Sequence, residues 1–106
     1  MNVKDGVKFS GVKKPLLEAI AKIYDIMEAT GEYTITSVSD GTHKPNSLHY
    51  KGLAMDLRSK HIPEGGPNGV EMVAERLRLH LGPDFDVVYE GAGTPNAHLH
   101  VEWDKD

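Results

Sequence analysis

Histidines and carboxylates gather in two short segments of this 106-residue chain. Residues 47–58 contain His49 and Asp56, and residues 97–103 read Ala-His-Leu-His-Val-Glu-Trp. A set of two histidines and one carboxylate binds a metal ion and leaves positions open for water and substrate. The two segments therefore predict a metal site. Zinc fits because hydrolysis needs no redox change, although the same ligands suit non-haem iron and the spacing alone does not name the ion.

His49 and Asp56 need a bend in the chain before they can meet. They are seven residues apart, a spacing that a regular helix would stretch over about two turns, or 10 Å. A bend at Gly52 can return His49 to the side of Asp56, which we place on a strand over residues 53–58. Alternation along that strand directs Asp56 and Arg58 to the same face.

The second segment alternates polar and apolar side chains. Residues 97–103 put His98, His100 and Glu102 on one face of a strand and the apolar side chains on the other. An ordinary half-buried strand needs no such polar face, so we expect chemistry there. Either His98 or His100 can complete the metal set with His49 and Asp56. The loop before the first segment adds His43.

The two remaining histidines have simpler explanations. A lone histidine is most often solvated, and we expect this of His61 and His80. His80 also lies in the last turn of a predicted helix, where it complements the helix dipole.

The elements that position these residues can be read from periodicity. Residues 15–30 and 69–81 have helical spacing of apolar residues, and four segments have the character of strands: 33–38, 53–58, 85–89 and 97–103. The order favours an α+β fold, with two main helices packed on a small, largely antiparallel sheet. We expect residues 1–106 to form a single domain.

Two details of the predicted helices can be tested in a structure. The apolar stripe of the first helix is expected to include Leu17 and Tyr24, with Gly31 at its C-terminal cap. Asn68 is expected to cap the second helix.

The composition excludes several classes of protein. The chain has no Cys, so it has no disulfide, no thiolate nucleophile and no Cys-ligated metal. A net charge of -4 argues against a nucleic-acid-binding protein. No apolar run exceeds three residues, so we expect no membrane span, and residues 1–14 lack the apolar core of a signal peptide.

The motifs resemble a known superfamily. Ser47-x-His49-x-x-Gly52-x-Ala54-x-Asp56, followed by a downstream His-x-His, resembles the zinc D-alanyl-D-alanine carboxypeptidases and L-alanyl-D-glutamate endopeptidases of bacterial cell walls. The hedgehog signalling domain, which shares their fold, is more similar still. It has an Asp-Gly-x-His loop like residues 40–43 and a match to residues 85–90. The similarity covers about two thirds of the chain, residues 36–102.

The resemblance implies roles for particular residues. Zinc would be held by His49, Asp56 and His100, the second histidine of the pair. Ser47 matches a residue that helps to hold substrate. The other matches lie in the same pocket: Glu90 is the carboxylate near the metal-bound water, and His43 and His98 line the site.

The chain also departs from the pattern. Many cell-wall peptidases of this kind have an acidic base three residues before the last ligand, and here that position is Ala97. Glu90 is therefore the expected base, with Glu102 as the second candidate. An upstream Arg that binds the substrate carboxylate has no match, so Arg58 or Lys44 is expected to replace it.

Neighbours of Asp40 bear on a further metal. Asp40 matches one position of a calcium site in the hedgehog domain, but the three residues before it are Ser37, Val38 and Ser39. None of them is acidic, so calcium is not predicted.

The implied activity is hydrolysis of a peptide bond in bacterial cell-wall peptides. Glu90 would move the proton, and His43 or His98 would donate to the oxyanion. The expected partner is a peptidoglycan stem peptide or a related small peptide, and the expected form is a monomer, either cytoplasmic or a phage-associated lysis protein. The alternative is a non-catalytic, zinc-stabilised binding module, because the hedgehog domain acts chiefly as a ligand for receptors.

Overall fold

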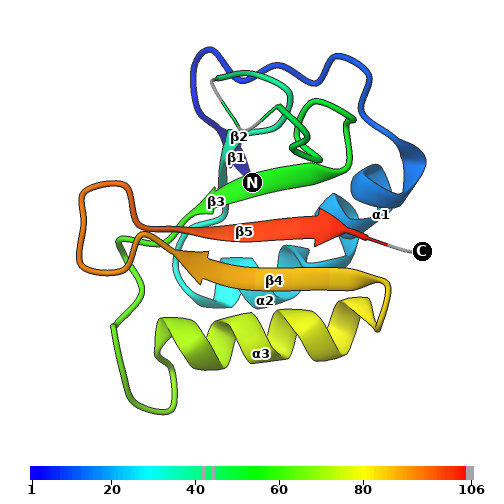
Figure 1. Ribbon diagram of the computed structural model, residues 1–106. Helices are drawn as coiled ribbons and strands as arrows, with labels where there is room; N and C mark the ends of the chain where they lie inside the picture. The colour runs from blue at the N-terminus through cyan, green and yellow to red at the C-terminus, as the bar shows by residue number, and fades with distance from the viewer. Residues whose placement is uncertain (42, 44, 105–106) are drawn as a thin grey trace.

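The computed structural model describes residues 1–41, 43 and 45–104. Within them the chain forms three helices and one five-stranded sheet (Figure 1). The helices are α1 (Lys14–Lys22), α2 (Tyr24–Ala29) and α3 (Val70–Leu81). The strands are β1 (Asn2–Val3), β2 (Thr34–Ser37), β3 (Ala54–Arg58), β4 (Phe85–Glu90) and β5 (His98–Trp103). The predicted α+β class is therefore confirmed.

The sheet is mixed and mostly antiparallel. Its strand order is β1-β2-β3-β5-β4, and every neighbouring pair is antiparallel except β1 and β2. The four strands predicted from the sequence are all present, and each of their bounds differs from the prediction by at most one residue. The parallel edge strand β1 was not expected, because two residues are too few to show alternation.

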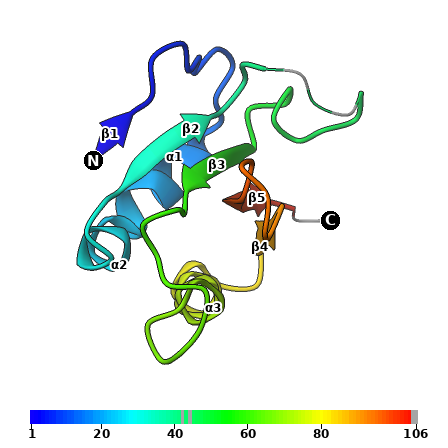
Figure 2. The same cartoon turned by 90° about the vertical axis from the view of Figure 1, so that its left-hand side faces the viewer.

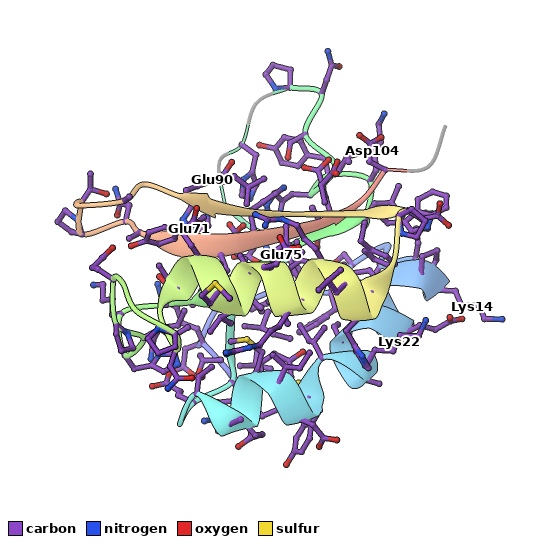
Figure 3. All side chains as sticks on the ribbon, turned by 90° about the horizontal axis from the view of Figure 1, so that it is seen from below. Lys14, Lys22, Glu71, Glu75, Glu90 and Asp104 are labelled. Carbon is purple, nitrogen blue, oxygen red and sulfur yellow. The ribbon has the colours of Figure 1, made fainter. Side chains whose placement is uncertain are left out.

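The core lies between one face of the sheet and the helices. Figure 2 shows α2 and α3 on one side of the sheet and the segment between β2 and β3 on the other. Figure 3 shows side chains filling the space between α3 and α2. Val73 and Leu77 of α3 are buried in this core. Burying a side chain of this size contributes about 1.5–3 kcal/mol. Among the described residues, no helix is long and apolar enough to cross a membrane.

The first helix is interrupted, which corrects the prediction of one helix over residues 15–30. The chain leaves helical geometry at Ile23, with φ -90° and ψ 3°, and resumes in α2. Periodicity does not reveal the bend because the buried stripe continues through it, with Ile23 and Met27 both fully buried. Leu17 and Tyr24 were wrongly assigned to this stripe, since they are 50% and 47% exposed.

The helix ends agree only in part with the prediction. Gly31 directly follows Thr30, the C-cap residue of α2. Its φ of +106° is the positive value expected of a glycine that ends a helix. Gly69, and not Asn68, is the N-cap of α3, and no side chain caps that end. The prediction was wrong because the preceding loop folds back on itself: its Pro63 carbonyl accepts the N–H of Val70 at 2.8 Å.

Candidate metal centre

The pairing of β3 with β5 brings the two histidine and carboxylate segments together. Asp56 is directly opposite His100, and Arg58 is opposite His98. The intervening residues Leu57 and Leu99 are fully buried in the core. The polar side chains therefore lie on the face of the sheet away from the helices, as alternation predicts.

His49 reaches the same face from the turn before β3. Gly52 closes this turn with φ +73°, and its N–H donates to the His49 carbonyl at 3.1 Å. A Cβ at Gly52 would lie 2.8 Å from the Cα of Val12, so no larger residue fits. The bend expected at Gly52 places His49 Nε2 3.2 Å from Asp56 Oδ1.

The imidazole of His49 is buried and held in one orientation. Its Nδ1 donates to the Val38 carbonyl at 2.7 Å, and the side chain is 3% exposed. Because Nδ1 is engaged by this carbonyl, Nε2 is the nitrogen that faces Asp56. A metal-binding histidine is usually oriented by such a partner on its other nitrogen.

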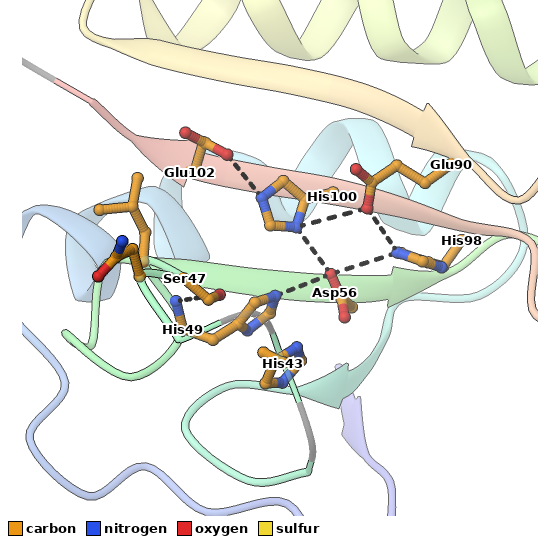
Figure 4. A pocket seen from close by; sticks show the side chains of 10 residues that line it. His43, Ser47, His49, Asp56, Glu90, His98, His100 and Glu102 are labelled. Carbon is orange, nitrogen blue, oxygen red and sulfur yellow. Dashed lines mark hydrogen bonds and ion pairs between the residues drawn. The ribbon is translucent and has the colours of Figure 1, made fainter.

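Asp56 is the common neighbour of three histidines (Figure 4). Its Oδ1 lies 3.2 Å from His49 Nε2, 3.0 Å from His100 Nδ1 and 3.6 Å from His98 Nε2. Burial would raise the pKa of Asp56, but hydrogen bonds from His100 and His49 outweigh it and hold the pKa well below its usual range. The carboxyl group is therefore ionised and ready to bind a cation.

His100 lies between two carboxylates. Its Nδ1 faces Asp56, and its Nε2 lies 2.7 Å from Glu102 Oε1. Burial would lower the pKa of His100, but the hydrogen bonds with Asp56 and Glu102 raise it to about 9.

Glu90 and His98 form the rim of the site. Glu90 Oε1 lies 3.0 Å from His98 Nε2 and 3.9 Å from His100 Nδ1. His98 Nδ1 faces the Asn96 carbonyl at 2.7 Å. The side chain of Glu90 is 47% exposed, so it can meet a ligand that enters from solvent.

His43 packs against the buried histidine. Its ring stacks on His49 with centroids 3.9 Å apart and planes 6° apart. The Tyr50 hydroxyl accepts the N–H of His43 at 2.7 Å, and the carbonyl of His43 lies 3.0 Å from the same hydroxyl. The ring of His43 is fixed by the Asp40 carbonyl, 2.8 Å from Nε2. Tyr50 was not singled out in the sequence, because a tyrosine in a loop has no distinctive spacing.

These side chains line one pocket of about 570 Å³. Ser47 and Leu48 form part of its wall, and its lining includes seven histidines and carboxylates: His43, His49, Asp56, Glu90, His98, His100 and Glu102. A neighbouring groove of about 310 Å³ shares Asp56 and His98 with the pocket.

That groove is lined by three cationic side chains, namely Lys4, Arg58 and Lys60. Arg58 forms an ion pair with Glu32 at 3.2 Å. Neither lysine was identified from the sequence, because Lys60 lies in the turn after β3 and Lys4 follows the unexpected strand β1. Lys44, the other predicted replacement for an arginine, lies outside the described residues.

The donor set fits a metal ion. Donor atoms lie within 4.8 Å of one another in two groups that share Asp56: His43, His49 and Asp56, and Asp56, Glu90 and His98. His100 Nδ1 adds a further donor 3.0 Å from Asp56. Imidazole nitrogens and a buried, ionised carboxylate together favour a transition metal over calcium or magnesium, which prefer oxygen ligands.

His61 and His80 lie outside this site. His80 is exposed on α3, as expected. His61 is half-buried, and its Nε2 lies 2.9 Å from Thr30 Oγ1, so the prediction of a solvated side chain was wrong. The sequence did not show this contact because it joins the end of α2 to the loop after β3.

Comparison with known proteins identifies no protein that is similar to this chain. No family model matches the chain, and searches of curated proteins and of solved structures return no match. The assignment of function therefore depends on the geometry of the site.

Proposed function

We propose that this protein is a zinc metallopeptidase of the hedgehog-like and D-alanyl-D-alanine carboxypeptidase type, acting as a single domain on peptides of the bacterial cell wall. The observation that carries the proposal is the meeting of His49 Nε2 and His100 Nδ1 at one oxygen of Asp56, at 3.2 and 3.0 Å. This donor set lies in an open pocket, as a catalytic metal needs, and not in a closed one.

His49, Asp56 and His100 are the proposed ligands, and the zinc chemistry follows from them. Two histidines and one carboxylate are a common protein set for catalytic zinc. When bound, zinc lowers the pKa of a coordinated water toward about 7 and polarises the scissile carbonyl.

Glu90 is the proposed general base. Its Oε1 is 3.9 Å from His100 Nδ1, the nitrogen that faces Asp56, so its carboxylate lies on the metal side of that ring. Glu102 lies on the opposite side, next to Nε2. Glu90 accepts a proton from the attacking water and passes it to the leaving amine.

His98 is the proposed donor to the tetrahedral oxyanion. Its ring lies at the rim of the pocket, where Nδ1 faces the Asn96 carbonyl and Nε2 faces the Glu90 carboxylate. An N–H of this ring can donate to the carbonyl oxygen as negative charge develops on it. His43, the alternative donor, supports the buried His49 by stacking.

The pocket and its neighbouring groove suit an acidic peptide. Ser47 lines the pocket, and Arg58 lines the adjoining groove together with Lys4 and Lys60. Three cations beside the metal site favour a substrate that carries a carboxylate. A peptidoglycan stem peptide, bound by a monomer of this chain, has this chemistry.

The decisive experiment combines metal analysis with product analysis. We expect the purified protein to bind one zinc ion and to release peptide or amino-acid products from peptidoglycan. Glu90→Gln is expected to retain the zinc and to lose about 10²–10⁴-fold in kcat, as removal of a general base does. Full activity in Glu90→Gln would exclude Glu90 as the base. A zinc-loaded wild-type protein that binds the peptides without cleaving them would instead identify the non-catalytic binding module.

A further inference from the structure

We propose that Glu102 is a positioning residue: it holds the proton of His100 on Nε2 and thereby presents Nδ1 to the metal. Glu102 is thus assigned to the orientation of a ligand and not to proton transfer in the reaction. The inference rests on the metal site of the proposed function, and it is tested through metal binding and not through peptidase activity.

The two nitrogens of His100 face different oxygen atoms. Nε2 lies 2.7 Å from Glu102 Oε1, whereas Nδ1 lies 3.0 Å from Asp56 Oδ1 (Figure 4). A histidine that binds a metal ion is neutral and has one N–H, and an ionised carboxylate can only accept it. If that N–H points to Glu102, the lone pair of Nδ1 is free for a metal ion bound beside Asp56, on the side where His49 also lies. The opposite tautomer would place a proton in the metal position.

The surroundings of Glu102 favour this hydrogen bond. Its strand partners on the same face are Ala54 of β3 and Asp86 of β4. The carboxylates of Asp86 and Asp104 lie within 4.8 Å of that of Glu102. These like charges repel Glu102, and the His100 N–H gives its carboxylate a favourable partner.

The two histidine ligands therefore have different outer partners. Nδ1 of His49 donates to a neutral carbonyl, that of Val38, whereas Nε2 of His100 donates to a carboxylate. A carboxylate partner fixes the ring and also raises its basicity as a ligand. Loss of such a partner typically costs 10–100-fold in metal affinity.

The test measures zinc affinity by competition with a chelator, in the whole chain. Glu102→Ala is expected to bind zinc about 10–100-fold more weakly than the wild type. Glu102→Gln keeps an acceptor oxygen and loses only the charge, so its affinity should fall between the two. Asp86→Asn is the matched control: it removes a neighbouring carboxylate that does not contact His100, and its affinity should stay within about 3-fold of wild type.

A spectroscopic readout separates orientation from general destabilisation. In the zinc-loaded wild type, long-range ¹H–¹⁵N correlation should show His100 bound through Nδ1, with a slowly exchanging proton on Nε2. This proton should exchange rapidly in Glu102→Ala and stay protected in Asp86→Asn. If Glu102→Ala does not fold, the same measurements are made on Glu102→Gln, whose side chain has nearly the same shape as glutamate.

The outcomes distinguish this inference from the proposed function. If Glu102→Ala binds zinc as tightly as the wild type, or keeps the protected proton, the inference is overturned while the metal site stands. If the wild type binds no zinc, the inference and the proposed function both fail. If zinc binds but no peptide is cleaved, the role of Glu102 is unaffected.

Discussion

At the scale of single residues, Asp56 is the centre of the candidate metal site. One of its oxygens lies within 3.6 Å of a nitrogen from each of His49, His98 and His100. Three imidazole nitrogens therefore share one carboxylate oxygen as their acceptor. A metal ion bound beside Asp56 would accept the lone pairs of two of these nitrogens and relieve the competition for that oxygen.

Asp56→Asn tests this view directly. The amide keeps the shape of the side chain but loses the charge, so zinc affinity is expected to fall by more than about 100-fold, beyond the loss that follows removal of an outer partner. Equilibrium dialysis with zinc, followed by metal analysis, measures the change. Asp5→Asn, at an exposed turn, serves as the control. Stoichiometric zinc in Asp56→Asn would contradict the ligand assignment.

A second residue-scale prediction concerns pH and Asp40. Burial would raise the pKa of Asp40, but its carboxylate accepts the N–H groups of Val38 and Lys8 at 2.9 and 3.1 Å, and the net effect lowers the pKa. A lowered pKa stabilises the fold above the unfolded value of about 3.9, and this contribution is lost as the pH falls through the folded pKa.

The wild type is therefore expected to be more stable than Asp40→Asn at pH 7, by about 1–2 kcal/mol for hydrogen bonds to a charged group. The difference should shrink below pH 4, because protonated Asp40 resembles Asn. Urea unfolding of both proteins across this pH range measures it. A difference that stays constant down to pH 2 would contradict the prediction.

Sequence patterns identify the residues of the site but not all of their contacts. The spacing of His49, Gly52 and Asp56 predicts the turn, and alternation predicts the shared face of His98, His100 and Glu102. The sequence did not predict that Glu102 contacts Nε2 of His100, because alternation places a side chain on a face without giving its direction. It also misjudged His61, whose partner Thr30 is distant in the sequence.

At the scale of elements, the turn before β3 determines where His49 lies. Gly52→Ala is expected to destabilise the protein by roughly 2–4 kcal/mol, because alanine is strained at φ +73° and its Cβ would lie 2.7 Å from the carbonyl carbon of Gly11. Zinc affinity should fall as well, since the same turn presents His49.

Gly65→Ala is the matched control for this substitution. A Cβ at Gly65 meets no atom within 4 Å, so this variant should unfold like the wild type. Urea denaturation compares the three proteins. Equal stability of Gly52→Ala and Gly65→Ala would show that the turn tolerates a side chain and does not fix His49.

Helices and strands were predictable where the periodic pattern of apolar residues is long. They were missed where the element is short or where the chain bends without interrupting that pattern. The buried stripe of α3 and the alternation of β5 gave their bounds to within a residue. The break at Ile23 was missed because both segments share one stripe. Strand β1 was missed because it has two residues, and with it the place of Lys4 in the groove beside the site.

At the scale of the whole molecule, the proposed metal binding is expected to stabilise the folded state. The proposed ligands come from β3, β5 and the turn before β3, so an unfolded chain does not hold them together. Zinc at 100 times its Kd is expected to stabilise the fold by about 2.7 kcal/mol. Thermal unfolding with zinc and with EDTA measures this effect, and Asp56→Asn should show no difference between the two. An EDTA-insensitive wild type would contradict the metal site.

Side chains of strand β5 point alternately into the core and into the pocket. Leu99 and Val101 are buried, while His98 and His100 line the pocket. A single inserted or deleted residue within β5 would exchange these two sets, turning imidazoles inward and aliphatic side chains outward. Residues 91–95 are exposed and lie outside the sheet, so their number can vary without moving the ligands. Insertions and deletions are therefore expected to be tolerated in residues 91–95, whereas an odd-numbered insertion inside β5 would disrupt both the core and the candidate metal site.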